Sequence, residues 1–226
     1  MAAYSDIADI PRGKYGVIYA DPPWHFEVWA EGSGRNASSK YGTMRAADIA
    51  AMPIAELAAP DCVLFTWICW PKLFDAVEVI KGWGFSYKTC AFSWMKADPY
   101  RLWADDKTPF AGMGYWTRAN TEPCLLATRG KPKRLHADVR QGVIAERREH
   151  SRKPDGMHER IERLVAGPYL EMFARQTRPG WDCFGNETGK FDKPYSPRDD
   201  FNKGVNACYE AIRERVANGG EPWHPK

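Results

Sequence analysis

The sequence lacks the signatures of the common metal and nucleotide-cofactor sites. Its six cysteines form no Cys-x-x-Cys pair and have no histidine at ligand spacing, which excludes the usual zinc sites and indicates a reducing compartment. No Gly-x-Gly-x-x-Gly follows the first expected strand, and no Gly-x-x-x-x-Gly-Lys-Ser/Thr occurs, so nicotinamide, flavin and phosphate-loop ATP sites are not indicated. We therefore expect a protein without a metal ion.

Long apolar runs and a strong net charge are also missing. No run is long enough to cross a membrane, and Met1–Ile10 lacks the basic start and apolar stretch of a signal peptide, which favours a cytoplasmic protein with no membrane partner. The net charge of +3 does not indicate a uniform polyanion-binding surface. Positive charge is instead concentrated between Arg129 and Lys153, where the local net charge is +6. This basic segment is either a solvated loop or a contact for phosphate groups.

The hydrophobic pattern predicts one full-sized domain of the α/β class. Of the 226 residues 44% are hydrophobic, which is enough for a substantial core. Short apolar runs alternate with helical patterns, which is typical of a doubly wound sheet. The expected strands are 17–20, 63–67, 87–95, 124–128, 143–145, 169–174 and 181–184, and the expected helices are 46–57 (broken at Pro53), 73–81, 155–165 (capped by Asp155) and 202–216. We assign residues 1–190 to the domain and 191–226 to a tail with one helix.

The most informative feature is Asp21-Pro22-Pro23-Trp24, directly after the apolar run Val17–Ala20. Two prolines neither continue a strand nor enter a helix interior, so the chain stops there in a fixed, extended turn. The turn places a carboxylate, two backbone carbonyls and an indole at the carboxyl end of a strand, where ligands bind in open α/β sheets. Taken alone, such a turn can also be only a loop capped by its aspartate.

These groups suit methyl transfer to the exocyclic amine of a nucleobase. That amine is a poor nucleophile because its lone pair is delocalised into the ring, and it reacts only when its hydrogens are held and the lone pair is localised. The Asp21 carboxylate and the Pro22 carbonyl are acceptors suited to the two hydrogens. Pro23 and Trp24 offer flat apolar surface for the base, and such stacking is worth about 1–3 kcal/mol per base.

Further sequence blocks follow in a fixed order over residues 15–188. They are Tyr19–Trp24, Lys40–Met44, Leu64–Trp67, Gly82–Phe85, Gly114–Trp116, Glu122–Leu125, His150–Asp155, Glu162–Leu164, Leu170–Arg175 and Gly180–Glu187. In these blocks the chain resembles the adenine-N6 methyltransferase family that contains the catalytic subunit of the messenger-RNA adenine methyltransferase and bacterial and phage DNA adenine methylases. The resemblance implies an α/β, Rossmann-like fold that uses S-adenosyl-L-methionine (SAM). It also implies a permuted order, with the catalytic motif first and the cofactor motifs near the carboxyl terminus.

The resemblance assigns roles to individual residues. Lys153 matches a family lysine near the methionine carboxylate of SAM, and Arg175 matches a position near the ribose. The full implied cofactor set is Asp6, Ile7, Asp21, Lys153, Glu171, Arg175, Asn186 and Glu187. Two alternatives stay open: Asp9-Ile10 competes with Asp6-Ile7 for its place, and Glu171 and Arg175 either bind the cofactor or form a structural ion pair.

Contacts to the substrate are predicted on loops. Tyr41 and Trp116 are aromatic loop residues that either stack on a flipped base or pack within their loops. Arg134 and Lys153, in the basic segment, are expected to contact the nucleic acid. The histidines, among them His158, are interpreted as surface residues and none is assigned as a base.

The expected activity is SAM-dependent methylation of the N6 amine of adenine in a nucleic acid. DNA is favoured over RNA because the chain shows no added RNA-binding module of the zinc-finger type. The alternatives are an RNA adenine-N6 methyltransferase, a catalytically silent nucleic-acid-binding subunit, and a methylase of another amine. The sequence leaves open whether the protein is a monomer or a homodimer.

Overall fold

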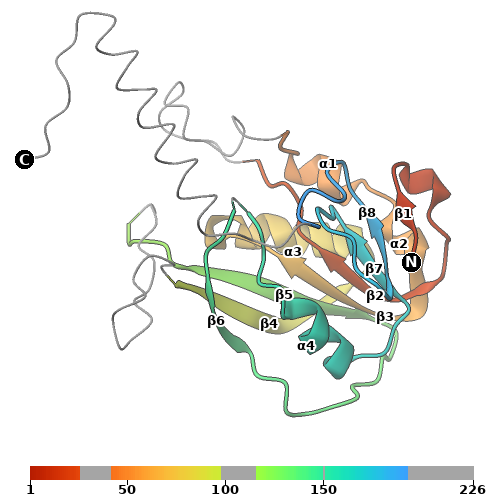
Figure 1. Ribbon diagram of the computed structural model, residues 1–226. Coiled ribbons are helices and arrows are strands. Elements are labelled where there is room, and N and C mark those ends of the chain that lie inside the picture. Colours follow the sequence, from red (N-terminus) through yellow and green to blue (C-terminus); the bar gives the residue numbers. More distant parts are fainter. Residues whose placement is uncertain (26–41, 98–115, 150, 193–226) are drawn as a thin grey trace, which may run out of the picture.

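The computed structural model describes residues 1–25, 42–97, 116–149 and 151–192 (Figure 1). Within these ranges the chain forms an eight-stranded sheet with short helices packed on it. The strands are β1 (Ala3–Tyr4), β2 (Tyr15–Ala20), β3 (Ala58–Trp67), β4 (Ser86–Ala97), β5 (Thr121–Arg129), β6 (Gly142–Glu146), β7 (Tyr169–Met172) and β8 (Trp181–Phe184). The α-helices are α1 (Ala46–Ala50), α2 (Ile54–Leu57), α3 (Leu73–Gly82) and α4 (Met157–Leu164), and the 3-10 helices are η1 (Ile7–Asp9) and η3 (Trp70–Lys72).

The strands lie in the order β1-β8-β7-β2-β3-β5-β4-β6. Neighbouring strands are parallel except on the two sides of β5, which runs against β3 and β4. The carboxyl ends of the parallel strands and the amino end of β5 therefore meet at one end of the sheet. We call it the Asp21 end, because Asp21 directly follows β2, and we call the other the opposite end.

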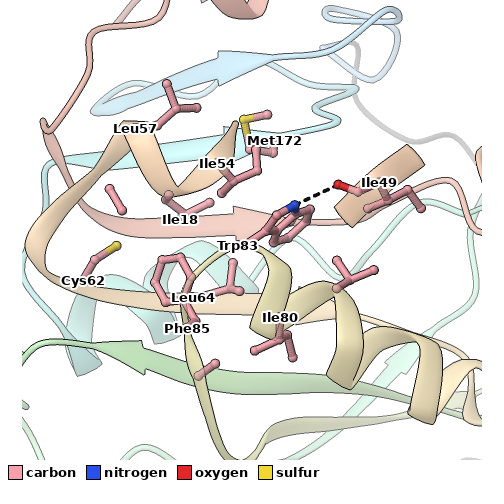
Figure 2. Close-up of a cluster of buried hydrophobic side chains, with 14 of the residues drawn as sticks. Ile18, Ile49, Ile54, Leu57, Cys62, Leu64, Ile80, Trp83, Phe85 and Met172 are labelled. Carbon is pink, nitrogen blue, oxygen red and sulfur yellow. Dashed lines mark hydrogen bonds between the residues drawn. The ribbon is translucent and has the colours of Figure 1, made fainter. Parts of the chain in front are cut away.

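One face of the sheet is covered by α1, α2 and α3. Ile18 of β2 and Leu64 of β3 belong to this core cluster, together with residues of the three helices. Figure 2 shows Trp83 among them, with its indole N–H donating to the Ile49 carbonyl over 2.8 Å. A fully buried indole needs such a partner, and this bond ties the end of α3 to α1.

The other face is covered by α4. Val17 and Tyr19, which alternate with Ile18 along β2, pack there against Met157 and Ile161 of α4. Helices thus lie on both faces, as the predicted doubly wound arrangement requires, and the α/β class is confirmed. The sheet is mixed rather than fully parallel because β5 is reversed.

The expected elements differ from the observed ones mainly at their ends. β3 and β4 extend beyond the apolar runs that predicted them, and the two-residue β1 has no pattern that predicts it. α4 begins after Gly156 with no side-chain cap, so the prediction of Asp155 as its N-cap is wrong; Asp155 pairs with Arg148 instead.

The helix predicted at 202–216 lies outside the described residues, whereas Phe191 is 7% exposed and packs with the domain. No helix in the described part of the chain is long and apolar enough to cross a membrane.

A buried carboxylate joins the N-terminal segment to the sheet. Asp182 of β8 accepts hydrogen bonds from the Ala2 N–H (2.7 Å), the Lys14 ammonium (2.7 Å) and the Tyr15 hydroxyl (3.0 Å). Burial by itself would raise the pKa of Asp182, but these hydrogen bonds outweigh it and lower that pKa below its usual value.

We expect Asp182→Ala to lower the free energy of unfolding at pH 7 by about 1–3 kcal/mol, because it leaves buried donors unpaired. Since the pKa of Asp182 is lowered in the folded protein, its contribution is present above the ordinary carboxyl pKa and is lost as the pH falls through the folded value. Urea unfolding at pH 7 and pH 3 measures this: the difference between the variant and the native protein shrinks at pH 3. Glu78→Ala, in an exposed pair with Lys81, is the control and changes stability little at either pH.

Candidate active site

The Asp21-Pro22-Pro23-Trp24 turn begins where β2 ends and is fixed by backbone hydrogen bonds. The Asp21 N–H donates to the Met172 carbonyl over 3.5 Å, which extends the pairing of β2 with β7 by one residue. The Trp24 N–H donates to the Pro22 carbonyl over 2.9 Å, and the Met44 N–H donates to the Pro23 carbonyl over 2.8 Å. The extended turn predicted after the first strand is therefore present, and the Asp21 side chain is 25% exposed at its start.

The structure corrects the role predicted for Trp24. Its side chain is only 5% exposed and lies in the same core cluster as Ile18 and Leu64. Its indole N–H donates to the Trp67 carbonyl over 3.0 Å. A ring buried this deeply does not stack on a base from solution, so in this structure Trp24 anchors the turn to the core.

Side-chain alternation brings the predicted residues to the face of the sheet that α4 covers. Asp21 follows Tyr19 by two residues, and Glu171 lies beside Tyr19 in the register of β2 and β7. A pocket opens at the Asp21 end of this face, and Asp21, Lys153, Glu171 and Arg175 are among the residues that line it. The structure thus brings together four residues from three segments that are separate in the sequence, around Asp21, Lys153 and 171–175.

The centre of this site is a chain of alternating charges. The Lys153 ammonium lies 2.6 Å from Asp21 Oδ2 and 2.9 Å from Glu122 Oε1, and the Lys96 ammonium lies 2.7 Å from Glu122 Oε2. All four side chains are at least 75% buried. We call these four residues, Asp21, Lys153, Glu122 and Lys96, the ionic chain.

The members of the ionic chain shift one another's pKa values. Burial would raise the pKa of Glu122, but Lys153 and Lys96 outweigh it and lower that pKa to about 2. Burial raises the pKa of Asp21 above its usual value, with Lys153 opposing and Glu122 adding to the increase. The carboxylates of Asp21 and Glu122 raise the pKa of Lys153, and they outweigh the burial of its ammonium, which would lower that pKa. At neutral pH Glu122 and Lys153 are therefore charged, and Asp21 titrates at higher pH than an exposed aspartate.

Glu171 pairs with a histidine rather than with Arg175. His158 Nε2 lies 2.7 Å from Glu171 Oε2, and the imidazole meets the rings of Trp181 and Tyr19 edge to face. The His158 side chain is 13% exposed, so the prediction of a surface histidine is wrong. Of the two alternatives left open for Glu171 and Arg175, the structural ion pair is not among the ion pairs of the described residues, in which Glu171 pairs with His158 and Arg175 with Glu187.

Arg175 lies on the other side of the pocket. Its Nε is 2.9 Å from Glu187 Oε2, and its guanidinium stacks over the ring of Phe191 at 4.5 Å. Phe173, two residues earlier, has φ of +63°, in the left-handed region that a bulky residue rarely adopts. This conformation turns the chain directly after β7.

Gly185 allows the segment after β8 to lie against the segment after β7. A Cβ atom at Gly185 would lie 2.2 Å from the Ala174 carbonyl oxygen and 2.7 Å from the Ala174 nitrogen, so only glycine fits. The exposed Asn186 follows Gly185, and the Glu187 carboxylate forms an ion pair with Arg175 of the segment after β7. The two predicted cofactor segments, 171–175 and 186–187, are therefore neighbours.

The basic segment does not form one surface. Arg129 pairs in register with Cys62, while Cys124 pairs with Trp67, so β5 ends at the opposite end of the sheet, about 17 Å along the strands from the Asp21 end. The exposed Arg134 follows there, so the reversed direction of β5 places it away from the Asp21-Pro22-Pro23-Trp24 turn. Its predicted contact with the nucleic acid stays a prediction.

β6 then carries the chain back to the Asp21 end. The cations there are engaged: Arg148 binds Asp155, and Arg152 binds Glu149 and Asp155. These pairs hold the loop that presents Lys153. The apparent patch of positive charge is thus divided between a paired group at the Asp21 end and an exposed group at the opposite end.

The remaining predicted residues are less closely tied to the pocket. Asp6 caps η1 by accepting from the Ala8 N–H over 2.9 Å, and Ile7 packs against the core; both follow β1, at the Asp21 end of the outermost strand. Trp116 is fully exposed and precedes β5. Tyr41 lies outside the described residues. In the described ranges no group of three or more His, Cys, Asp or Glu side chains is arranged to hold a metal ion.

Sequence reasoning gave no role in the site to Glu122, Lys96 or His158. Glu122 had a detectable signal, because it is a charged residue at the start of an otherwise apolar strand. Lys96 ends a strand-like run and looks like any exposed lysine, and His158 falls within a polar helix. Only the strand order shows that they meet the catalytic turn and Glu171.

Known proteins resemble this chain over most of its length. Residues 15–187 match the MT-A70 family model. The chain is 32% identical over 215 residues to the Type II methyltransferase M.MunI of Mycoplasma sp. The matched region covers 86% of this chain and 87% of M.MunI.

Two eukaryotic proteins match a smaller share of their own length. The N(6)-adenosine-methyltransferase MT-A70-like protein of Arabidopsis thaliana is 30% identical over 77% of this chain and 24% of its own length. The N(6)-adenosine-methyltransferase catalytic subunit METTL3 of Homo sapiens is 29% identical over 81% of this chain and 30% of its own length. The chain thus spans most of M.MunI and less than a third of either eukaryotic protein.

We expect Gly185→Ala to separate the segments after β7 and β8, because the new Cβ atom has no room beside Ala174. The variant should fold but lose at least tenfold in affinity for any ligand of the pocket. Calorimetric titration with SAM, the ligand implied by the resemblance, measures this. Gly142→Ala, where a Cβ atom meets nothing within 4 Å, is the control. Unchanged affinity in Gly185→Ala would show that the contact is not needed for binding.

Proposed function

The chain belongs to the MT-A70 family of adenine-N6 methyltransferases, and from this premise we propose that it transfers the methyl group of SAM to the N6 amine of adenine in DNA. The observation that carries the proposal is the Asp21-Pro22-Pro23-Trp24 turn, which is held rigid beside a charged pocket at one end of the sheet. Ligands of open α/β sheets bind at this end of the strands.

The proposal of DNA as the substrate rests on how much of each relative the chain matches. The similarity to the Type II methyltransferase M.MunI covers 87% of that protein, whereas the two N(6)-adenosine-methyltransferases are matched over 24% and 30% of their length. The domain therefore corresponds in extent to M.MunI. The groups of the catalytic turn do not distinguish the two polymers, because both present the same base.

The pocket fits SAM in its chemistry. SAM carries a carboxylate, a ribose diol and a cationic sulfonium, and the pocket offers cations beside carboxylates: Lys153 and Arg175 with Asp21 and Glu171. The Lys153 ammonium has three hydrogens and donates to Asp21 at 2.6 Å, to Glu122 at 2.9 Å and to the Ser151 carbonyl at 3.5 Å; the last and longest of these bonds would give way to an anionic group of SAM. Glu171 would accept from the ribose hydroxyls, and Asn186 and Glu187 would complete that side. When bound, SAM supplies an electrophilic methyl group, so no metal is needed for the transfer.

The chain's own residues prepare the amine. Asp21 holds one amine hydrogen through its carboxylate, and the Pro22 carbonyl holds the other. That carbonyl has two lone pairs, and the Trp24 N–H takes one of them. Both acceptors lie on a turn fixed to β7 and to the segment around Met44, and such positioning supplies much of the rate of a two-substrate transfer. Asp21 need not act as a strong base, since the methylated, cationic amine loses its proton readily.

The base needs a flat contact that Trp24 does not provide. Pro23 is partly exposed next to the acceptors and is suited to one face of the adenine. Trp116, fully exposed before β5, and Tyr41 are the proposed partners for the other face or for a neighbouring base. A base in a duplex must be flipped out to reach this turn, which costs a few kcal/mol and is avoided in a single strand.

The permuted order is proposed on the same grounds. The catalytic turn follows β2, early in the chain, and the proposed cofactor segments follow β7 and β8, late in the chain. β7 nevertheless pairs directly with β2, so both parts of the site lie side by side.

Asp21→Ala should abolish methyl transfer, with a loss of roughly 10²–10⁴-fold or more, because the amine loses its charged acceptor. SAM binding should change less, because Glu171 and Arg175 stay in place and Glu122 still holds Lys153. Transfer from isotopically labelled SAM to matched single-stranded DNA, double-stranded DNA and RNA, followed by nucleoside analysis, measures the product and the preferred polymer. Asp48→Ala, which removes an exposed carboxylate from α1, is the control. Turnover retained in Asp21→Ala would overturn the mechanism.

The exposed cations at the opposite end are proposed to contact phosphates away from the target base. Replacing Lys131, Lys133 and Arg134 by alanine should weaken binding of a duplex of about 30 base pairs and reduce the slope of log K against log salt by roughly 0.9 per lost contact. Methylation of the shortest accepted substrate should not change, because the opposite end is about 17 Å from the turn. An equal effect on short and long substrates would argue against a distant contact.

A further inference from the structure

We propose that Glu122, supported by Lys96, is a positioning residue that holds the Lys153 ammonium away from full pairing with Asp21. The inference rests on the proposed function, in which Asp21 is the acceptor for the amine. The inference is drawn from the ionic chain. Its four side chains come from four separate segments: the turn after β2, the end of β4, the start of β5 and the loop after β6.

Lys153 by itself has little to fix its position. A lysine side chain is long and flexible, and its ammonium is a compact point charge. The loop that carries it is held at its base by Arg148 and Arg152 through their pairs with Glu149 and Asp155. The tip is held by Asp21 and Glu122, and it lies 5.5 Å from the centre of the Trp67 ring.

Glu122 competes with Asp21 for this one cation. In the structure the ammonium lies between Asp21 Oδ2 at 2.6 Å and Glu122 Oε1 at 2.9 Å, so Asp21 engages it through a single oxygen. Without Glu122 only the Ser151 carbonyl, at 3.5 Å, remains as a second acceptor among the described residues, and the ammonium would move toward both oxygens of Asp21. The carboxylate would then be occupied where the amine hydrogen has to be accepted.

Lys96 keeps Glu122 available for this role. It binds the second oxygen of Glu122 at 2.7 Å, at the carboxyl end of the neighbouring strand β4. Two cations around one carboxylate keep it ionised, in agreement with a pKa of about 2. Lys96 has no contact with Asp21 among the interactions of the described residues, so its influence passes through Glu122.

The prediction concerns the pH dependence of the transfer. Among the described residues, the charged groups that face Asp21 are Lys153, Glu122 and Arg175, and the charged groups that face Glu122 are Lys153 and Lys96. The Cys69 and Cys124 thiols interact with both carboxylates, and the Tyr19 hydroxyl interacts with Asp21. Glu122→Gln removes a negative charge that raises the pKa of Asp21 and releases Lys153 toward Asp21. Both changes lower the pKa of Asp21, so the acid limb of the kcat profile should move to lower pH.

Glu122→Gln should also reduce kcat by about 10–100-fold, as is typical when a residue that orients a reacting group is lost. The KM for SAM should change less than kcat, because Glu171 and Arg175 are untouched. Glu122→Asp, which keeps the charge, should recover part of kcat. Glu78→Gln, in an exposed pair with Lys81 on α3, is the matched control and should change neither quantity.

A double-mutant cycle separates positioning from a general loss of structure. Lys96→Met alone should reduce kcat, and in the Glu122→Gln background it should have no further effect, because Lys96 acts only through Glu122. Additive losses in the cycle, or lower kcat with an unmoved acid limb, would overturn the proposal.

The carboxyl pKa of Asp21, measured by carbon NMR in the native protein and in Glu122→Gln, tests the same point without activity. A lower value in the variant supports the positioning role, and an unchanged value contradicts it. If the native protein transfers no methyl group to any polymer, the proposed function fails while the NMR result still decides the role of Glu122. Thermal unfolding of each variant identifies one that simply fails to fold, and Lys96→Met then provides the NMR comparison.

Discussion

The Lys153 ammonium is the interaction on which the candidate site depends. It lies within 3 Å of Asp21 and of Glu122, and so connects the turn after β2, the start of β5 and the loop after β6. Both carboxylates are largely buried, and a buried charge is stable only with a partner of opposite sign and with hydrogen bonds. Lys96 completes the alternation. The three segments therefore hold one arrangement because any other would leave a charge in the interior without a partner.

The reversed direction of β5 makes this arrangement possible. A parallel strand in its place would bring its carboxyl end, with Arg129, to the Asp21 end and would carry Glu122 away. In the observed direction, the start of β5 places Glu122 beside the Asp21 turn, and the exposed cations around Arg134 follow the other end of the strand, at the opposite end of the sheet. One topological feature thus explains both the ionic chain and the separation of the basic segment into two groups.

Much of the fold was predictable from local patterns. The buried strand before Asp21 and the α3 helix have apolar spacing that admits few alternatives, and both are observed. The rigid turn was predictable because two consecutive prolines restrict the backbone directly. The burial of Trp24 was not, since an indole suits a core and a base-stacking surface equally well, and the choice depends on what packs around it. The partner of Glu171 was missed for a similar reason: Arg175 is near in sequence, but His158 is near in space.

The sequence by itself determined the rigid turn at Asp21-Pro22-Pro23-Trp24, the α/β class and the family, because these depend on the order of residues along the chain. It also identified Lys153, Glu171 and Arg175 one at a time, through the blocks in which they occur. Only the tertiary structure decided which of them meet. Strand order and direction bring Glu122 and Lys96 to Lys153, pair His158 with Glu171, and remove Arg134 from the catalytic turn. Contacts between segments more than a hundred residues apart, such as Asp21 with Lys153, leave no local pattern, because they are set by how the strands assemble.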